Sequence, residues 1–104
     1  MSDLSTKKSS KTFAESKIKV KEPDLYKVVM LNDNYTTMEF VVDVLIDIFG
    51  KSEAEARKIM LAVHKQGRGV AGTYVYDIAV SKVEQVERRA KSKGFPLKCV
   101  VEKE

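Results

Sequence analysis

The nine residues from Asn32 to Phe40 constrain the fold of this chain more than any other stretch, because they join two different apolar patterns. The preceding residues 25–31 form a run rich in β-forming side chains with no breaker. Beyond the stretch, apolar residues recur at helical spacing at Phe40, Val41, Val44, Leu45, Ile48 and Phe49. The chain therefore passes from a strand, through a polar turn, into a helix. Polar side chains in such a turn can point at a ligand while both flanking elements stay rigid.

Helix-capping patterns give the limits of the first elements. We predict a strand at residues 25–32 and a helix at residues 37–49. Thr36 and Glu39 have the spacing of a capping box at the start of this helix, and Gly50 is placed to end it.

The same logic predicts a second helix at residues 53–66. Ser52 and Glu55 repeat the capping-box spacing, and Gly67 supplies the stop. We expect its buried face to be formed by Ala56, Ile59, Met60 and Val63.

The remainder of the chain predicts two more strands and one more helix. Residues 68–76 carry Gly69 and Gly72 within a β-branched and aromatic run, which indicates a loop leading into a second strand. A third helix, ending near Gly94, follows from the spacing of Ile78, Ala79, Val83, Val86 and Ala90. After Pro96, alternation at Leu97, Cys99 and Val101 marks a closing strand.

These elements have the order β-α-α-β-α-β, which predicts the α+β class. Three short strands are not stable on their own, so the helices must cover one face of the sheet. We therefore expect a two-layer α/β sandwich, with a three-stranded antiparallel sheet packed against three helices.

Charge separates a tail from a folded domain. Residues 1–22 hold six lysines against three acidic residues and so carry +3 of the net charge of +4. They contain few large apolar groups, and Pro23 follows them, so we predict a disordered N-terminal arm at residues 1–23 and one domain at residues 24–104. The domain itself is nearly neutral, unlike a folded nucleic-acid binder, which usually has a basic face.

The chain lacks the residues that most enzymes and metal sites need. It has one histidine, His64, and one cysteine, Cys99, and none of its serines lies in a glycine-rich elbow. No loop has the phosphate-cradling pattern, and Asp33 with His64 would be too few ligands for zinc. We therefore expect no catalytic residues, no metal and no cofactor.

The same sequence sets expectations for the environment of the protein. No apolar run reaches the roughly 18 residues of a membrane span, and no secretory signal is visible. A single cysteine cannot form an intramolecular disulfide, so we expect a cytoplasmic protein with Cys99 as a small core residue.

Ligand binding is better supported than catalysis. Met60, Val63 and His64 lie at i, i+3 and i+4 and so share one face of the second predicted helix. Met38 and Val41 lie three apart just after the polar turn. Together these side chains could form an apolar pocket with a polar rim, although a plain core for the methionines and valines and a solvated helix end for His64 explain the spacing too.

Three blocks of residues resemble one family. Residues 26–41, YKVVMLNDNYTTMEFV, residues 60–67, MLAVHKQG, and residues 95–99, FPLKC, are similar to ClpS, the bacterial adaptor family of the N-degron pathway. The resemblance covers about residues 24–104, in the family's order and spacing. It implies a small α/β sandwich that binds the N-terminal residue of a substrate, typically Leu, Phe, Tyr or Trp. Such adaptors hand the substrate to the unfoldase ClpA, or ClpC in some lineages, for degradation by ClpP.

The resemblance also implies roles for particular residues. The hydrophobic pocket would be lined by Thr36, Met38, Val41, Met60, Val63 and Leu97. Met38 matches the family's gatekeeping methionine, which disfavours β-branched first residues. The α-amino group would be bound by Asn32, Asn34 and His64, with Asp33 adding negative potential. Asp77 and Lys82 match charged residues that the family uses against the N-domain of the unfoldase, although ordinary exposed charges are the alternative.

One position departs from the family pattern, which usually has a second aspartate where this chain has Asn34. An amide oxygen still accepts a hydrogen bond from an ammonium group, but the charge-assisted bond is lost. We therefore predict weaker binding of N-terminal residues than with aspartate at this position.

Two other classes of function stay open. The sequence pI near 9.2 and the cluster Arg88, Arg89, Lys91 and Lys93 allow a nucleic-acid-binding module, although cations in a last helical turn also complement the helix dipole. The fold also resembles the C-terminal domain of the ribosomal stalk protein, which allows a purely structural interaction domain. We favour an adaptor that is a monomer and binds neither nucleic acid nor membrane.

Overall fold

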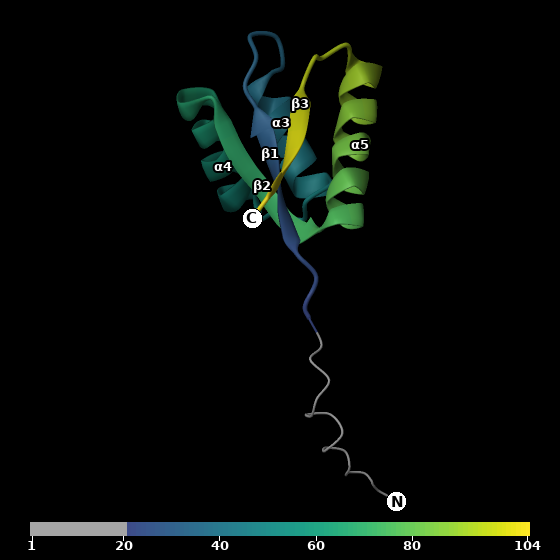
Figure 1. Cartoon of the computed structure of the whole chain (residues 1–104). Coiled ribbons are helices and arrows are strands. Elements are labelled where there is room, and N and C mark those ends of the chain that lie inside the picture. Colours follow the sequence, from purple (N-terminus) through teal and green to yellow (C-terminus); the bar gives the residue numbers. More distant parts are fainter. Residues whose placement is uncertain (1–20) are drawn as a thin grey trace, which may run out of the picture.

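The structure, a computed structural model, describes residues 21–104 (Figure 1). The predicted N-terminal arm lies almost wholly outside this range and stays a prediction. Within these residues six elements follow one another: β1 Leu25–Leu31, α3 Met38–Asp47, α4 Glu53–Gln66, β2 Arg68–Val75, α5 Tyr76–Lys93 and β3 Lys98–Lys103. The predicted order β-α-α-β-α-β is confirmed.

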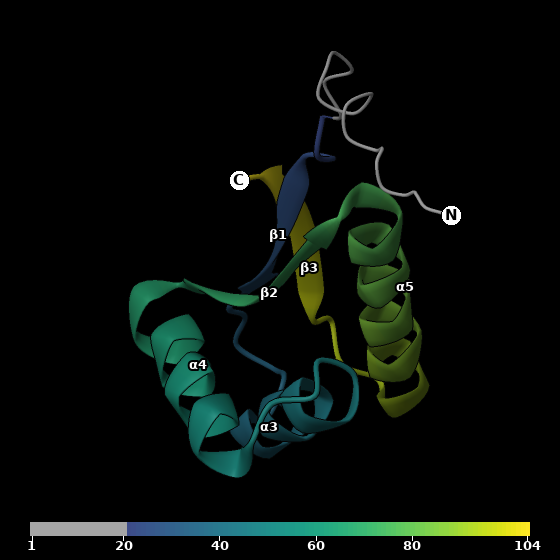
Figure 2. The ribbon, with the colours of Figure 1, turned by 90° about the horizontal axis from the view of Figure 1, so that it is seen from below.

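The three strands form one antiparallel sheet with the spatial order β2-β1-β3. β1 is therefore the central strand, and both its neighbours pair with it. Figure 2 shows the three helices on one side of this sheet. The predicted two-layer α/β sandwich is confirmed, and the layer of helices leaves the carboxyl end of β1 next to α3 and α4.

The core lies between the sheet and the helices. Val28 and Met30 of β1 are fully buried and face it, together with Val44 and Leu45 of α3. Cys99 of β3 is 6% exposed, as predicted for a small core residue. Burial, and secondarily the negative charge of Glu87, raises the pKa of the Cys99 thiol to about 12.

The start of α3 differs from the prediction. Thr37, not Thr36, caps the helix, because its hydroxyl accepts the backbone N–H of Phe40 at 3.1 Å. The predicted capping box of Thr36 and Glu39 is wrong, since the Thr36 hydroxyl donates instead to Asp33 at 2.7 Å. The helix also ends earlier than predicted, at Asp47.

The second helix agrees with the prediction at both ends. Ser52 and Glu55 form a reciprocal capping box, and Gly67 ends α4 in the left-handed conformation with φ 90°. The predicted loop after Gly67 is wrong, because Arg68 pairs at once with Leu31 and so begins β2. The strand therefore starts directly at the end of α4 and holds that end beside β1.

The apolar residues whose spacing predicted the last helix are not all buried. Ala79, Val86 and Ala90 of α5 are buried and Val83 is partly buried, but Ile78 is 48% exposed. Because α5 begins at Tyr76, Ile78 lies in its first turn. The helix ends at Gly94, as the sequence predicts.

Candidate functional site

The polar turn after β1 is tied to the end of α4. The backbone N–H of Asn32 donates to the carbonyl of Gly67 at 3.0 Å. Because Gly67 is also the left-handed cap of α4, this bond fixes the end of the strand against the end of the helix. Asn32 and His64 are thereby brought to the same corner of the molecule.

Asp33 organises the turn that follows. One carboxylate oxygen accepts the backbone N–H groups of Tyr35 and Thr36 at 2.8 and 2.7 Å, and the other accepts the Thr36 hydroxyl. Partial burial acts to raise the pKa of Asp33, but these hydrogen bonds outweigh it and lower the pKa below its ordinary value. Asp33 is therefore held ionised, with most of its acceptor capacity directed at the turn.

The turn, α3 and α4 enclose a cavity of about 220 Å³. Nine predicted site residues line it: Asn32, Asp33, Asn34, Thr36, Met38, Val41, Met60, Val63 and His64. Two of its walls thus come from the helices and the third from the polar turn. The structure brings these residues together, and their role in binding stays a prediction.

The cavity has an apolar interior and an accessible mouth. Val41, Met60 and Val63 are 6, 7 and 3% exposed and so form its interior. Met38, at the first residue of α3, is 43% exposed and stands at its mouth. Asn32, Asn34 and His64 are exposed. The geometry allows one apolar side chain to enter while polar atoms of the same ligand stay near these three side chains.

Leu97 is placed elsewhere. It is 3% exposed but lines a second cavity, of about 380 Å³, with Phe95, Pro96 and Lys98 at the connection from α5 to β3. The structure therefore does not bring Leu97 to the first cavity.

The two residues predicted to face the unfoldase differ in their surroundings. Asp77 is exposed in the first turn of α5. The Lys82 ammonium group donates to the carbonyl of Ile48 at 2.8 Å and lies 5.7 Å from the centre of the Tyr74 ring. Lys82 thus satisfies a carbonyl at the end of α3, in addition to any role at the surface.

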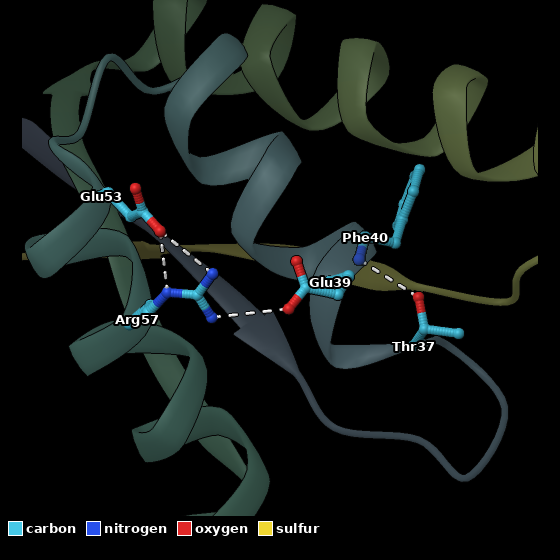
Figure 3. Close-up of polar contacts among 5 residues, drawn as sticks. All are labelled: Thr37, Glu39, Phe40, Glu53 and Arg57. Atoms are coloured by element: carbon cyan, nitrogen blue, oxygen red, sulfur yellow. Dashed lines mark hydrogen bonds and ion pairs between the residues drawn. The ribbon is translucent and has the colours of Figure 1, made fainter.

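Sequence reasoning missed a contact between the two helices that form the cavity. Arg57 of α4 lies between Glu53 of its own helix and Glu39 of α3 (Figure 3). The Glu53–Arg57 pair has the i,i+4 spacing that a sequence search can find. The Glu39–Arg57 pair joins residues 18 apart in sequence, and no local sequence pattern predicts it.

A close approach between β2 and α4 was also missed. A Cβ atom on Gly69 would lie 2.8 Å from a methyl carbon of Val63 and 3.2 Å from the Ile59 carbonyl oxygen. Glycine at this position therefore lets the strand pack tightly on the helix that carries Val63. The signal was present in the sequence as a glycine within a strand-like run.

The described part of the chain offers no metal centre. Among residues 21–104, no three His, Cys, Asp or Glu side chains gather closely enough to hold an ion. Within the same range, no helix combines the length and apolar character needed to cross a membrane.

Comparisons with known proteins agree with one another. The family profile "ATP-dependent Clp protease adaptor protein ClpS" matches residues 21–100. The ATP-dependent Clp protease adapter protein ClpS of Acetivibrio thermocellus is 52% identical over 90 residues, which are 86% of this chain and 91% of that protein. Its counterpart in Desulforapulum autotrophicum is 51% identical over 98 residues, covering 92% and 94%.

A solved structure of a relative has the same fold as this chain. Agrobacterium tumefaciens ClpS2, bound to L-phenylalaninamide, superposes with a TM-score of 0.77 at 41% identity, covering 80% of this chain and all of that one. The profile covers nearly the whole folded domain, so the match is not a shared fragment. The chain belongs to the ClpS family, whose members are adaptors of the Clp protease and not enzymes.

Proposed function

We propose that this adaptor binds the N-terminal residue of a substrate, of the bulky hydrophobic kind (Leu, Phe, Tyr or Trp), together with its α-amino group. It then delivers the substrate to the N-domain of ClpA or ClpC for degradation by ClpP. The observation that carries this proposal is one cavity that combines an apolar interior with exposed polar side chains at its mouth.

The size of the cavity favours a single side chain as the ligand. Pockets for drug-sized molecules and cofactors span about 300–1,000 Å³, and this cavity measures about 220 Å³. Its walls of Val41, Met60 and Val63 offer no charge to a polar guest. Burying a leucine or phenylalanine side chain there would contribute about 1.5–3 kcal/mol.

The polar mouth explains why the guest would be a chain terminus. An α-ammonium group brings one positive charge and three donors, whereas the backbone nitrogen of an internal residue carries no charge and only one donor. The amide oxygens of Asn32 and Asn34 and a neutral imidazole nitrogen of His64 are acceptors. The carboxylate of Asp33 accepts three hydrogen bonds within the turn and so contributes mainly its negative charge.

The ligand of a relative supports the same chemistry. Agrobacterium tumefaciens ClpS2 was solved with L-phenylalaninamide, a molecule that carries a free α-amino group, a phenyl side chain and an amide. These are the groups of an N-terminal phenylalanine in a peptide. By analogy, the phenyl ring would enter the cavity of this protein and the ammonium group would meet its polar mouth.

Delivery requires a second surface, and the exposed Asp77 supports the start of α5 as that surface. Lys82 is a weaker candidate, because its ammonium group is engaged with the Ile48 carbonyl.

The basic residues at the end of α5 give little support to nucleic-acid binding, because other roles in the fold explain them. Arg89 is paired with Asp47 at 2.6 Å, and Lys91 and Lys93 lie in the last turn, where cations complement the helix dipole.

Fluorescence anisotropy with peptides that differ only in their first residue tests the proposal. We expect peptides beginning with Phe or Leu to bind more tightly than one beginning with Ala, because only the former fill the apolar cavity. Equal affinities would show that the cavity does not discriminate between first side chains. Steeply salt-sensitive binding to generic RNA in place of peptide binding would favour the nucleic-acid alternative.

A further inference from the structure

The cavity has one wall on each of two helices, so its width depends on how those helices are held together. Met38 and Val41 come from α3, and Met60, Val63 and His64 come from α4. The cavity thus opens between the start of α3 and the later turns of α4. Any contact that ties the start of α3 to α4 is therefore placed to set the width of its mouth.

Arg57 makes such a contact (Figure 3). Its guanidinium group is anchored on its own helix by Glu53, with two nitrogens 3.1 Å from one carboxylate oxygen. A third nitrogen reaches across to Glu39 of α3 at 3.5 Å. The hydrogen bond to Glu53 and the charge of Glu39 raise the pKa of Arg57 above its ordinary value.

The residue that receives this contact is the neighbour of Met38. Glu39 and Met38 have adjacent Cα atoms, about 3.8 Å apart, in the first turn of α3. Phe40, the next residue, is held on the opposite side by Phe95, with ring centres 5.0 Å apart. The start of the helix is thus held from two directions. Among the hydrogen bonds and ion pairs of residues 21–104, the one that joins α3 to α4 is the contact of Arg57 with Glu39.

We propose that Arg57 is a positioning residue that acts through Glu39 to hold Met38 at the mouth of the cavity, and so sharpens the selection among first residues. The proposal rests on the proposed function and deepens it. Without the ion pair the start of α3 can move away from α4, which widens the mouth. A wider mouth admits β-branched side chains more readily and packs less closely around unbranched ones.

The test compares two peptides that differ only in their first residue, Phe or Ile, on the full chain and on its Arg57→Gln variant. The ratio of the two affinities removes the ammonium contribution, which both peptides share. We expect the preference for Phe over Ile to fall by about two- to fivefold in Arg57→Gln, the range that an exposed ion pair allows. A preference that is unchanged or increased would overturn the proposal.

Arg89→Gln is the matched control. Arg89 also ties α3 to another helix by an exposed ion pair, with Asp47, but at the far end of α3 from Met38. We expect it to leave the preference unchanged, whereas an equal fall in both variants would reveal a general loosening and would overturn the specific role. Arg57→Lys, which keeps the charge, should restore most of the preference.

The salt dependence of the preference for Phe over Ile is a second measurement. It would not change if Arg57 acted only by packing. At about 1 M salt the Debye length is about 3 Å, so the exposed ion pair is screened. The preference of the wild type should then approach that of Arg57→Gln, while the preference of the variant stays constant. A wild type that binds neither peptide would contradict the proposed function, whereas a wild type that binds with an Arg57-independent preference would contradict only this inference.

Discussion

Asn34 places an uncharged amide at the mouth of the cavity, where a carboxylate would bind the ammonium group of a substrate more strongly. An aspartate there would give the ammonium group a charge-assisted bond of about 1.5–3 kcal/mol in place of a neutral one of about 1 kcal/mol. Because Asn34 is exposed, solvent screens part of the difference. We therefore predict that Asn34→Asp tightens the binding of a Phe-initiated peptide by about three- to tenfold. Anisotropy titrations measure this directly, and equal affinities would show that residue 34 does not contact the ammonium group.

Asp33 contributes to stability through the pH dependence of its carboxylate. Its pKa is lowered in the folded state, so its contribution is present above the ordinary value of about 3.9 and is lost as pH falls through the folded value. We predict that Asp33→Asn destabilises the protein at pH 7 and that the difference from the wild type shrinks at pH 3. Urea unfolding of both proteins at the two pH values checks this. A difference independent of pH would mean that the ionised carboxylate does not stabilise the turn.

At the scale of single elements, sequence patterns succeeded where the deciding contacts are local. Ser52, Glu55 and Gly67 act within one turn of α4, and both ends of that helix were predicted. Thr36 failed as a cap because its hydroxyl donates to Asp33 in the turn, and the adjacent Thr37 caps the helix instead.

Contacts between elements could not be predicted in the same way. The bond from Lys82 to the Ile48 carbonyl joins residues 34 apart, and the Arg57–Glu39 pair joins residues 18 apart. Such pairs depend on how helices cross, which no periodicity reveals. Helical spacing had already grouped Met38, Val41, Met60, Val63 and His64 as a possible pocket. The family resemblance added further residues, among them Leu97, which the structure places beside a different cavity.

The packing of β2 on α4 gives a prediction at this scale. Gly69→Ala adds a Cβ atom 2.8 Å from the stiff, β-branched side chain of Val63 and 3.2 Å from a backbone oxygen. We predict a loss of about 1–3 kcal/mol in the free energy of unfolding and weaker peptide binding, because Val63 lines the cavity. Urea denaturation and anisotropy measure the two effects.

Gly50→Ala is the control for this substitution. Gly50 has a positive φ of 67°, but a Cβ atom there would meet no atom within 4 Å. Gly50→Ala should therefore destabilise the protein by about 1–2 kcal/mol through backbone strain while leaving the affinity for peptide unchanged. Gly69→Ala binding as tightly as the wild type would show that Val63 is not held by β2.

At the scale of the whole molecule, peptide binding should reside in the folded domain alone. Among residues 21–104, those that line the first cavity lie between positions 32 and 64. We predict that a variant lacking residues 1–20 binds a Phe-initiated peptide within about twofold of the full chain, a difference below 0.5 kcal/mol. Parallel anisotropy titrations of the two proteins check this. A much weaker truncated protein would place part of the binding site in the first twenty residues.

We propose that the protein recognises a chain terminus through its ammonium group and its side chain together. The most direct test compares a Phe-initiated peptide with the same peptide acetylated at its N-terminus, by fluorescence anisotropy against the unmodified protein. Acetylation keeps the phenyl ring but removes the charge and two of the three donors. We predict that the free peptide binds and that the acetylated one loses at least about tenfold in affinity. Equal affinities for the two peptides would contradict it.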